Sequence, residues 1–185
     1  MDEPSQFSMQ SFDFERLFKK KVTKEELLEK IASNPEEVRA FKQASPPTVE
    51  LRLSRINEGE KEYRLIAVRH LFDLSALGLV DLVSFGRSET NDLMSHTGTG
   101  EGIDLTVSRR HGLVVLNRKQ VYYIDIGTFD DGSKNGMRVN DELGKKIKNR
   151  VFPWNKFDYL GAGERIIVPE IGRDISRFKL EYSYL

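Results

Sequence analysis

The sequence has 185 residues and equal numbers of acidic and basic side chains, 29 of each, so its formal charge is zero. This balance argues against a protein whose main role is to coat nucleic acid or an anionic membrane. The absence of cysteine excludes disulfides, thiolate metal sites and cysteine nucleophiles. The length suits one domain of ordinary size with an extension.

The N-terminal segment shows no sign of a targeting signal. Residues 1–12 lack a basic stretch followed by an apolar run, so we expect no secretory signal. No segment approaches the roughly 20 apolar residues that span a bilayer, and the longest apolar stretch is interrupted by Asp73 and Asp81. We therefore expect a cytoplasmic protein without a membrane partner.

Residues 13–44 have apolar side chains at helical spacing. Thr23 is the first residue of a capping box, which predicts a helix start. Asn34 and Pro35 predict a second start, with Asn34 as the N-cap and Pro35 at the first helical position. We expect two or three short helices in this region.

Pro46 and Pro47 end the helical region, because paired prolines favour an extended connector. Alternating apolar and polar residues follow, which predicts strands. The predicted strands cover residues 49–54, 63–68, 79–85, 112–117, 121–126, 166–169 and 177–184. One helical turn fits the ambiguous segment between the second and third strands. Many short strands separated by Gly, Asp and Asn favour an antiparallel sandwich or barrel. We expect residues 1–47 to be a helical extension with a linker, and residues 48–185 to be the β domain.

Three loop-like segments carry residues suited to binding an anion on a peptide. Arg87 follows a predicted strand that ends at Gly86, and its guanidinium offers a fork of donors that matches a phosphate or carboxylate. Ser108 adds a neutral hydroxyl, and the two arginines that follow it add charge. Asn135 offers both a donor and an acceptor, which suits it to a peptide backbone.

These segments resemble the signature of the forkhead-associated (FHA) family, in which Gly-Arg, Ser-x-x-His and Asn-Gly with a later Asn follow in order. Gly86-Arg87, Ser108 to His111 and Asn135-Gly136 to Asn140 match this order. A Gly-acidic turn at residues 160–166 extends the resemblance over residues 48–185. The resemblance implies an all-β sandwich of about eleven strands, here with an N-terminal α-helical extension, that binds phosphothreonine on partner proteins.

The resemblance also implies a role for each site residue. Arg87 and Ser108 would contact the phosphate, with Arg109 as a supplement and Thr106 as a further candidate. Asn135 would hold the main chain of the ligand. The positions that would support the site structurally are Gly86, His111, Gly136 and Asn140.

Two features depart from the family pattern. A Gly-rich insertion at residues 97–102 lengthens the stretch between Arg87 and Ser108. Glu89 stands where some relatives carry a basic residue, and an acid there would oppose a dianionic ligand.

We therefore predict a non-catalytic signalling adaptor that binds a protein phosphorylated by a Ser/Thr kinase, without cofactor, metal or small-molecule substrate. Ser108 and His111 lack an orienting carboxylate at a recognisable spacing for nucleophilic catalysis. His70 and His96 lack the spacing of metal ligands. The alternatives are a phosphate-independent scaffold whose helical arm docks a partner or a second copy of the chain, and a nucleic-acid-associated protein that uses the basic residues 145–150. Phosphorylated Thr23 or Thr48 could also bind in cis.

Overall fold

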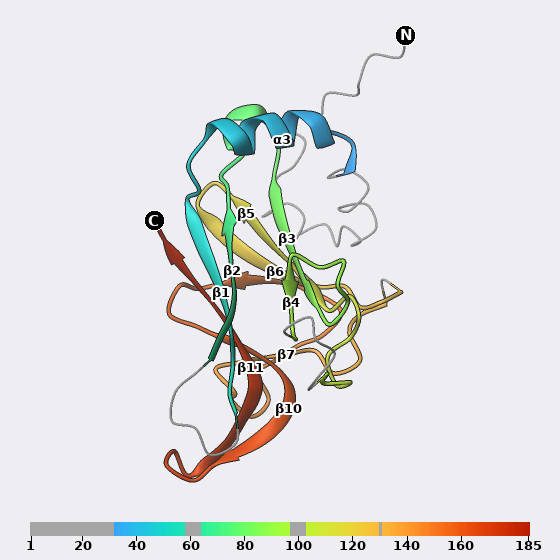
Figure 1. Ribbon diagram of the computed structural model, residues 1–185, viewed down its shortest axis with the longest axis vertical. Helices are drawn as coiled ribbons and strands as arrows, with labels where there is room; N and C mark the ends of the chain where they lie inside the picture. The colour runs from blue at the N-terminus through green and yellow to red at the C-terminus, as the bar shows by residue number, and fades with distance from the viewer. Residues whose placement is uncertain (1–31, 58–63, 97–102, 130) are drawn as a thin grey trace.

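Eleven strands in two sheets, one α-helix and one 3-10 turn make up the part of the chain that the structure describes (Figure 1). The structure is a computed structural model, and it describes residues 32–57, 64–96, 103–129 and 131–185. The predicted all-β sandwich with a helix on its N-terminal side is thus confirmed.

The first sheet has six strands in the order β2-β1-β11-β10-β7-β8. Its members are β1 (Val49–Arg55), β2 (Arg64–Leu71), β7 (Met137–Val139), β8 (Lys146–Ile147), β10 (Leu160–Val168) and β11 (Arg173–Tyr184). The second sheet has five strands in the order β4-β3-β5-β6-β9. Its members are β3 (Asp81–Gly86), β4 (Leu93–Met94), β5 (Gly112–Asn117), β6 (Gln120–Asp125) and β9 (Val151–Trp154). The 3-10 turn Ser75–Leu77 lies in the segment that the sequence left ambiguous.

Alternating side chains of the antiparallel strands form the core between the sheets. Leu53 of β1 is opposite Leu180 of β11, and both are fully buried. Trp154 of β9 is also fully buried and meets the ring of Tyr182 edge-on, with 4.8 Å between ring centroids. The alternation predicted for residues 177–184 therefore places one face of β11 in the core, except that Tyr184 at the strand end is 45% exposed.

One local prediction needs correction, and another is confirmed only in its positions. The strand predicted for residues 166–169 begins six residues earlier, at Leu160, and includes the glycine-rich segment that was read as a turn. An irregularity between Ala162 and Arg165, with Gly163 at a φ of +88°, lets this strand bend and still pair with β11. Asn34 is the N-cap residue and Pro35 begins the helix, as predicted, but the Asn34 side chain donates to the Ser33 hydroxyl and makes no capping hydrogen bond.

The helix α3 (Pro35–Ala44) lies across one end of the sandwich, at the start of β3 (Figure 1). Lys42 forms an ion pair with the buried carboxylate of Asp81, the first residue of β3, and lies over the ring of Phe72. Asp81 also accepts the backbone N–H groups of Phe72 and Leu82, each at 2.8 Å. The helix is thus attached at the end of β3 opposite to Gly86 and Arg87.

The helices predicted before residue 32 and the insertion at residues 97–102 lie outside the described residues. Residues 47 and 48 lie between α3 and β1, and their status as a domain boundary stays a prediction. Among the described residues, no helix has the length and the apolar character needed to cross a membrane.

The contact between Lys42 and Asp81 predicts a measurable difference between two ion pairs of the same helix. Lys42→Met keeps the apolar stem but leaves the Asp81 carboxylate, 2% exposed, without its cation. Because Lys42 itself is partly exposed, we expect the free energy of unfolding in urea to fall by about 1–3 kcal/mol, less than for a fully buried pair. Arg39→Ala removes an exposed pair with Glu36 and should change stability by less than about 0.5 kcal/mol. Equal effects of the two substitutions would contradict this account of the helix contact.

Candidate functional site

Strand β3 and the loop at residues 108–110 are hydrogen-bonded to each other where the strand ends. Arg87 donates its backbone N–H to the Ser108 carbonyl, and Ser88 donates to the Arg109 carbonyl, both at 3.1 Å. A side chain at Gly86 would collide with the Arg109 carbonyl oxygen, so the close approach of the two segments requires glycine. The side chains of Arg87 and Ser108 are consequently brought to the same end of the sandwich.

Two buried polar side chains hold the backbone around Arg87. Asn91 donates its side-chain amide to the carbonyls of Arg109 and Ser88, at 2.7 and 2.8 Å. His96 Nε2 lies 2.8 Å from the Arg87 carbonyl oxygen. Sequence reasoning considered His96 only as a metal ligand and did not consider Asn91. Both residues stand in the segment between the recognised motifs, where no pattern marked them.

His111 joins two loops of the site. Its Nδ1 accepts the backbone N–H of Ser108 at 3.0 Å, so the ring proton is on Nε2, which donates to the Gly136 carbonyl at 3.2 Å. Complete burial is the largest cause that lowers the pKa of His111, to about 4, against a smaller opposing effect of Asp125. The ring is therefore neutral at pH 7 and carries out both hydrogen bonds in one tautomer.

The loop at residues 132–136 is hydrogen-bonded to Asp125 on one side and to Ser108 on the other. Ser133 donates its backbone N–H to the buried carboxylate of Asp125 at 3.0 Å, and Gly136 donates to the Ser133 hydroxyl at 2.8 Å. Gly136 has a φ of +70°, and a side chain there would collide with the Ile147 carbonyl. Lys134 donates its backbone N–H to the Ser108 hydroxyl oxygen at 3.0 Å. That bond leaves the Ser108 hydroxyl proton available to a ligand.

A pocket of about 450 Å³ opens between these loops, and we term it the cationic pocket. It is lined by Arg87, Leu105, Ser108, Arg109, Thr128, Phe129 and Lys134. Three of these residues are cations and none is an acid. The buried Nε of Arg87 has no hydrogen-bond partner among the described residues. A buried donor without a partner costs free energy.

The other predicted site residues lie outside this lining. Asn135 donates its side-chain amide to the Thr106 carbonyl at 2.7 Å, and the Thr106 hydroxyl donates to Asp104. Asn140 sits at the far end of β7, where its side chain bonds Asp158 at 2.7 Å and the Tyr159 backbone at 2.9 Å. Glu89 is exposed and does not line the pocket.

Four lining residues were given no role by the sequence. Lys134 directly precedes Asn135 in a recognised motif, so its position was the available signal. Thr128 and Phe129 come from a loop whose return to Ser108 no local pattern predicts, whereas Leu105 lies three residues before Ser108 and belongs to no recognised motif. Leu105 and Phe129 are 71% and 83% exposed, which places large apolar side chains on the rim of a charged pocket.

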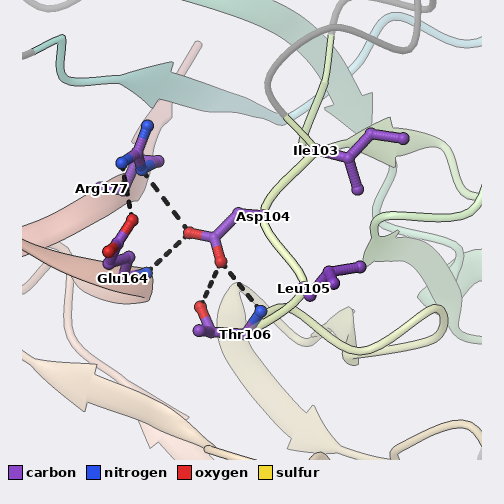
Figure 2. A pocket seen from close by; sticks show the side chains of 6 residues that line it. All are labelled: Ile103, Asp104, Leu105, Thr106, Glu164 and Arg177. Atoms are coloured by element: carbon purple, nitrogen blue, oxygen red, sulfur yellow. Dashed lines mark hydrogen bonds and ion pairs between the residues drawn. The ribbon is translucent and has the colours of Figure 1, made fainter.

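A second pocket, of about 270 Å³, shares Leu105 with the first, and we term it the Asp104 pocket. Figure 2 shows Asp104 at its centre, between Thr106 on one side and Glu164 and Arg177 on the other. Burial alone would raise the pKa of Asp104, but hydrogen bonds from Glu164 and Thr106 and the charge of Arg177 together lower it. Asp104 is therefore ionised at neutral pH. Arg177 also pairs with Glu164 at 2.7 Å, so the lining carries two carboxylates and one guanidinium.

Residues 83–153 match the family model of the FHA domain, which confirms the resemblance found in the sequence. No curated protein matches the chain. Among solved structures, the chain is similar to the FhaA FHA domain complexed with the intracellular domain of Rv3910, at 15% identity and a TM-score of 0.41, covering 74% of this chain and all of that one. It is also similar to Rad53 in complex with AMP-PNP, at 16% identity and a TM-score of 0.43, covering 74% of this chain and 30% of that one.

The burial of neutral His111 predicts a specific dependence of stability on pH. Because its pKa is about 4 in the folded state and about 6.5 in an unfolded chain, the unfolded state binds more protons below pH 6.5. The stabilisation is therefore complete above pH 6.5 and is lost as the pH falls toward 4. Urea unfolding at pH 7.5 and pH 5 should show a loss of about 2 kcal/mol from this residue.

An NMR titration of the His111 ring nitrogens checks the cause directly. The ring should stay neutral at pH 5 in the folded protein. His70, which is exposed, provides the control: His70→Asn should retain the loss of stability on acidification. A His111 ring that takes up its proton near pH 6.5 would contradict the assignment.

Proposed function

We propose that the protein is a phosphothreonine-dependent binding module, and that the cationic pocket receives the phosphate. The observation that carries this proposal is the lining of that pocket, where the side chains of Arg87, Arg109 and Lys134 surround the Ser108 hydroxyl, which accepts from the Lys134 backbone. All seven residues that line the pocket lie within residues 83–153, the segment that matches the FHA family model.

The lining fits a phosphate monoester chemically. At pH 7 a phosphorylated threonine carries a charge of about −1.5 to −2 and three strong acceptor oxygens. Arg87 supplies a planar fork of donors to these oxygens, whereas Arg109 and Lys134 add charge from the two neighbouring loops. Ser108 contributes a short neutral hydrogen bond that fixes orientation. The apolar side chains of Leu105 and Phe129 provide contact area for the peptide around the phosphate.

Asn135 and Thr106 would act on the ligand in a different way from the pocket-lining residues. The side-chain amide of Asn135 is occupied by the Thr106 carbonyl, which leaves its Oδ1 to accept an N–H of the ligand main chain. Thr106 supports this arrangement through its carbonyl, because its hydroxyl is already bonded to Asp104. We therefore keep Asn135 as the proposed main-chain contact and assign Thr106 a supporting role.

The hydrogen bonds of His111 favour binding over catalysis. A nucleophilic serine needs a base that takes the proton from its hydroxyl. Here Nδ1 of His111 faces the backbone N–H of Ser108, and Nε2 faces the Gly136 carbonyl. Neither nitrogen is directed at the Ser108 hydroxyl, so the serine is suited to donating a hydrogen bond. The partner that fits is a protein phosphorylated on threonine by a Ser/Thr kinase, and the role that fits is an adaptor in signalling.

Substitution of Arg87 tests this proposal. A degenerate peptide library with a fixed central phosphothreonine should yield ligands with dissociation constants of about a micromolar. Arg87→Gln removes the charge and the fork, and it should weaken the selected peptide at least about 30-fold in fluorescence anisotropy, as for truncation of one partner of a hydrogen-bonded charge pair. Lys156→Gln removes an exposed charge from the turn beside Asn140 and should leave affinity unchanged.

The same peptide without its phosphate supplies the second control. We expect its binding to fall below detection, because the cationic pocket then has no dianion to accept from Arg87. Equal binding of both peptides, or full binding by Arg87→Gln with an intact fold, would contradict the proposed function.

A further inference from the structure

Three more cations continue from the cationic pocket along β8 and the turn that follows it. Lys146, Lys148 and Arg150 are all exposed, and we term them the basic segment. Lys148 donates its ammonium to the carbonyl oxygen of Lys134 at 3.1 Å, and Arg150 donates its guanidinium to the Lys146 carbonyl at 3.0 Å. Lys134 lines the cationic pocket, so its hydrogen bond with Lys148 places the basic segment next to that pocket.

A single buried carboxylate fixes the pocket and the basic segment relative to each other. One oxygen of Asp125 accepts the backbone N–H of Ser133 at 3.0 Å and that of Asn149 at 2.6 Å. Ser133 directly precedes Lys134, and Asn149 lies between Lys148 and Arg150. The cations of both segments are therefore carried by backbone that shares one anchor, and a ligand meets them at fixed spacing.

These cations have no acidic partner in the part of the chain that the structure describes. Among the described residues, neither the three cations of the pocket nor the three of the basic segment form an ion pair. Lys145, the neighbour of Lys146, does pair, with Glu142. Asp131, in the same loop as Lys134, is exposed and does not line the pocket. Six cations that form no ion pair with a described residue are thus carried by neighbouring loops in a chain whose formal charge is zero.

The charge around the site is also asymmetric. In the first sheet, β8 is at the edge and β7 separates it from β10 and β11. The Asp104 pocket takes Glu164 from β10 and Arg177 from β11, and its lining has one more carboxylate than cation (Figure 2). A peptide with its phosphate in the cationic pocket would meet positive charge toward Lys148 and weak negative charge toward Glu164.

We propose that the preferred ligand carries a second anionic group next to the phosphothreonine, on the side that faces Lys148 and Arg150. This inference rests on the proposed function and names the class of ligand more narrowly. The second group is either a carboxylate or another phosphate, because both accept from exposed ammonium and guanidinium groups. An acidic residue on the side of Glu164 does not raise the affinity of the peptide. The preference for a second anion therefore has one direction along the peptide.

An anion scan of one phosphopeptide tests the direction of this preference. The starting peptide is the tightest library ligand, with every acidic residue other than the phosphothreonine replaced by alanine. Aspartate or phosphoserine is then placed singly at each position within four residues on either side. We expect affinity to rise about threefold or more for aspartate on one side only, from rim charge pairs, and further for phosphoserine.

A charge-removing double variant assigns the preference to the basic segment. The double variant Lys148→Gln, Arg150→Gln should bind the alanine-substituted phosphopeptide as tightly as the unsubstituted protein does. It should show no rise in affinity when the second anion is added to the peptide. Lys156→Gln with Arg173→Gln removes the same total charge from exposed positions elsewhere and should leave the gain intact. The gain should also shrink between about 50 mM and about 500 mM salt, because exposed charges are screened.

The outcomes separate this inference from the proposed function. If no phosphothreonine peptide binds, the proposed function fails. The inference alone fails if phosphopeptides bind but a second anion leaves their affinity unchanged or raises it equally on both sides. It also fails if the double variant keeps the gain in affinity. A short DNA duplex that binds more tightly than the doubly anionic peptide, and that loses affinity in the double variant, would also overturn it, because the basic segment would then serve nucleic acid.

Discussion

The neutral ring of His111 holds together the two loops on which the candidate site depends. It accepts the backbone N–H of Ser108 on one side and donates to the Gly136 carbonyl on the other. The ring is completely buried at the start of β5, so neither bond is weakened by water. Because Lys134 bonds the Ser108 hydroxyl, the same ring indirectly sets the distance between the serine and the lysine of the pocket. A protonated ring could not accept from Ser108, and the loop would lose its support.

The groups that build the site are separate from the groups that face the ligand. Gly86, Asn91 and His111 bond only backbone or lie against it, and they are buried. The cations and the hydroxyl of Ser108 point into the pocket from backbone that these residues fix. This division keeps the ligand-facing donors in place before a ligand arrives, which reduces the entropy lost on binding. It also lets the proposed phosphate site and the basic segment share the anchor at Asp125 without sharing side chains.

Much of the fold could be predicted because the strands are short, alternating and bounded by turn residues. The bounds of β5 match the prediction, and β1, β3, β6 and β11 differ from it by a few residues. The start of β10 was missed because glycines at residues 161 and 163 resemble a turn, although a bulge accommodates them within the strand. The motifs located Arg87, Ser108 and Arg109 at the pocket: Arg87 directly follows β3, and the other two lie in the loop that precedes β5. Phe129 was missed because its proximity to Ser108 depends on how a separate loop returns, which no local spacing encodes. Lys134 and Leu105 stand within or beside recognised motifs, but those patterns assign them no role.

The central claim is that the guanidinium of Arg87 binds the phosphate, and NMR observation of its Nε–H group tests that claim most directly. The ¹⁵N-labelled protein is titrated with a phosphothreonine peptide and with the same peptide lacking phosphate. The account predicts that the Arg87 Nε–H resonance moves downfield and exchanges more slowly with solvent only when the phosphorylated peptide binds. A phosphopeptide that binds while the Arg87 Nε–H resonance stays unchanged would contradict it.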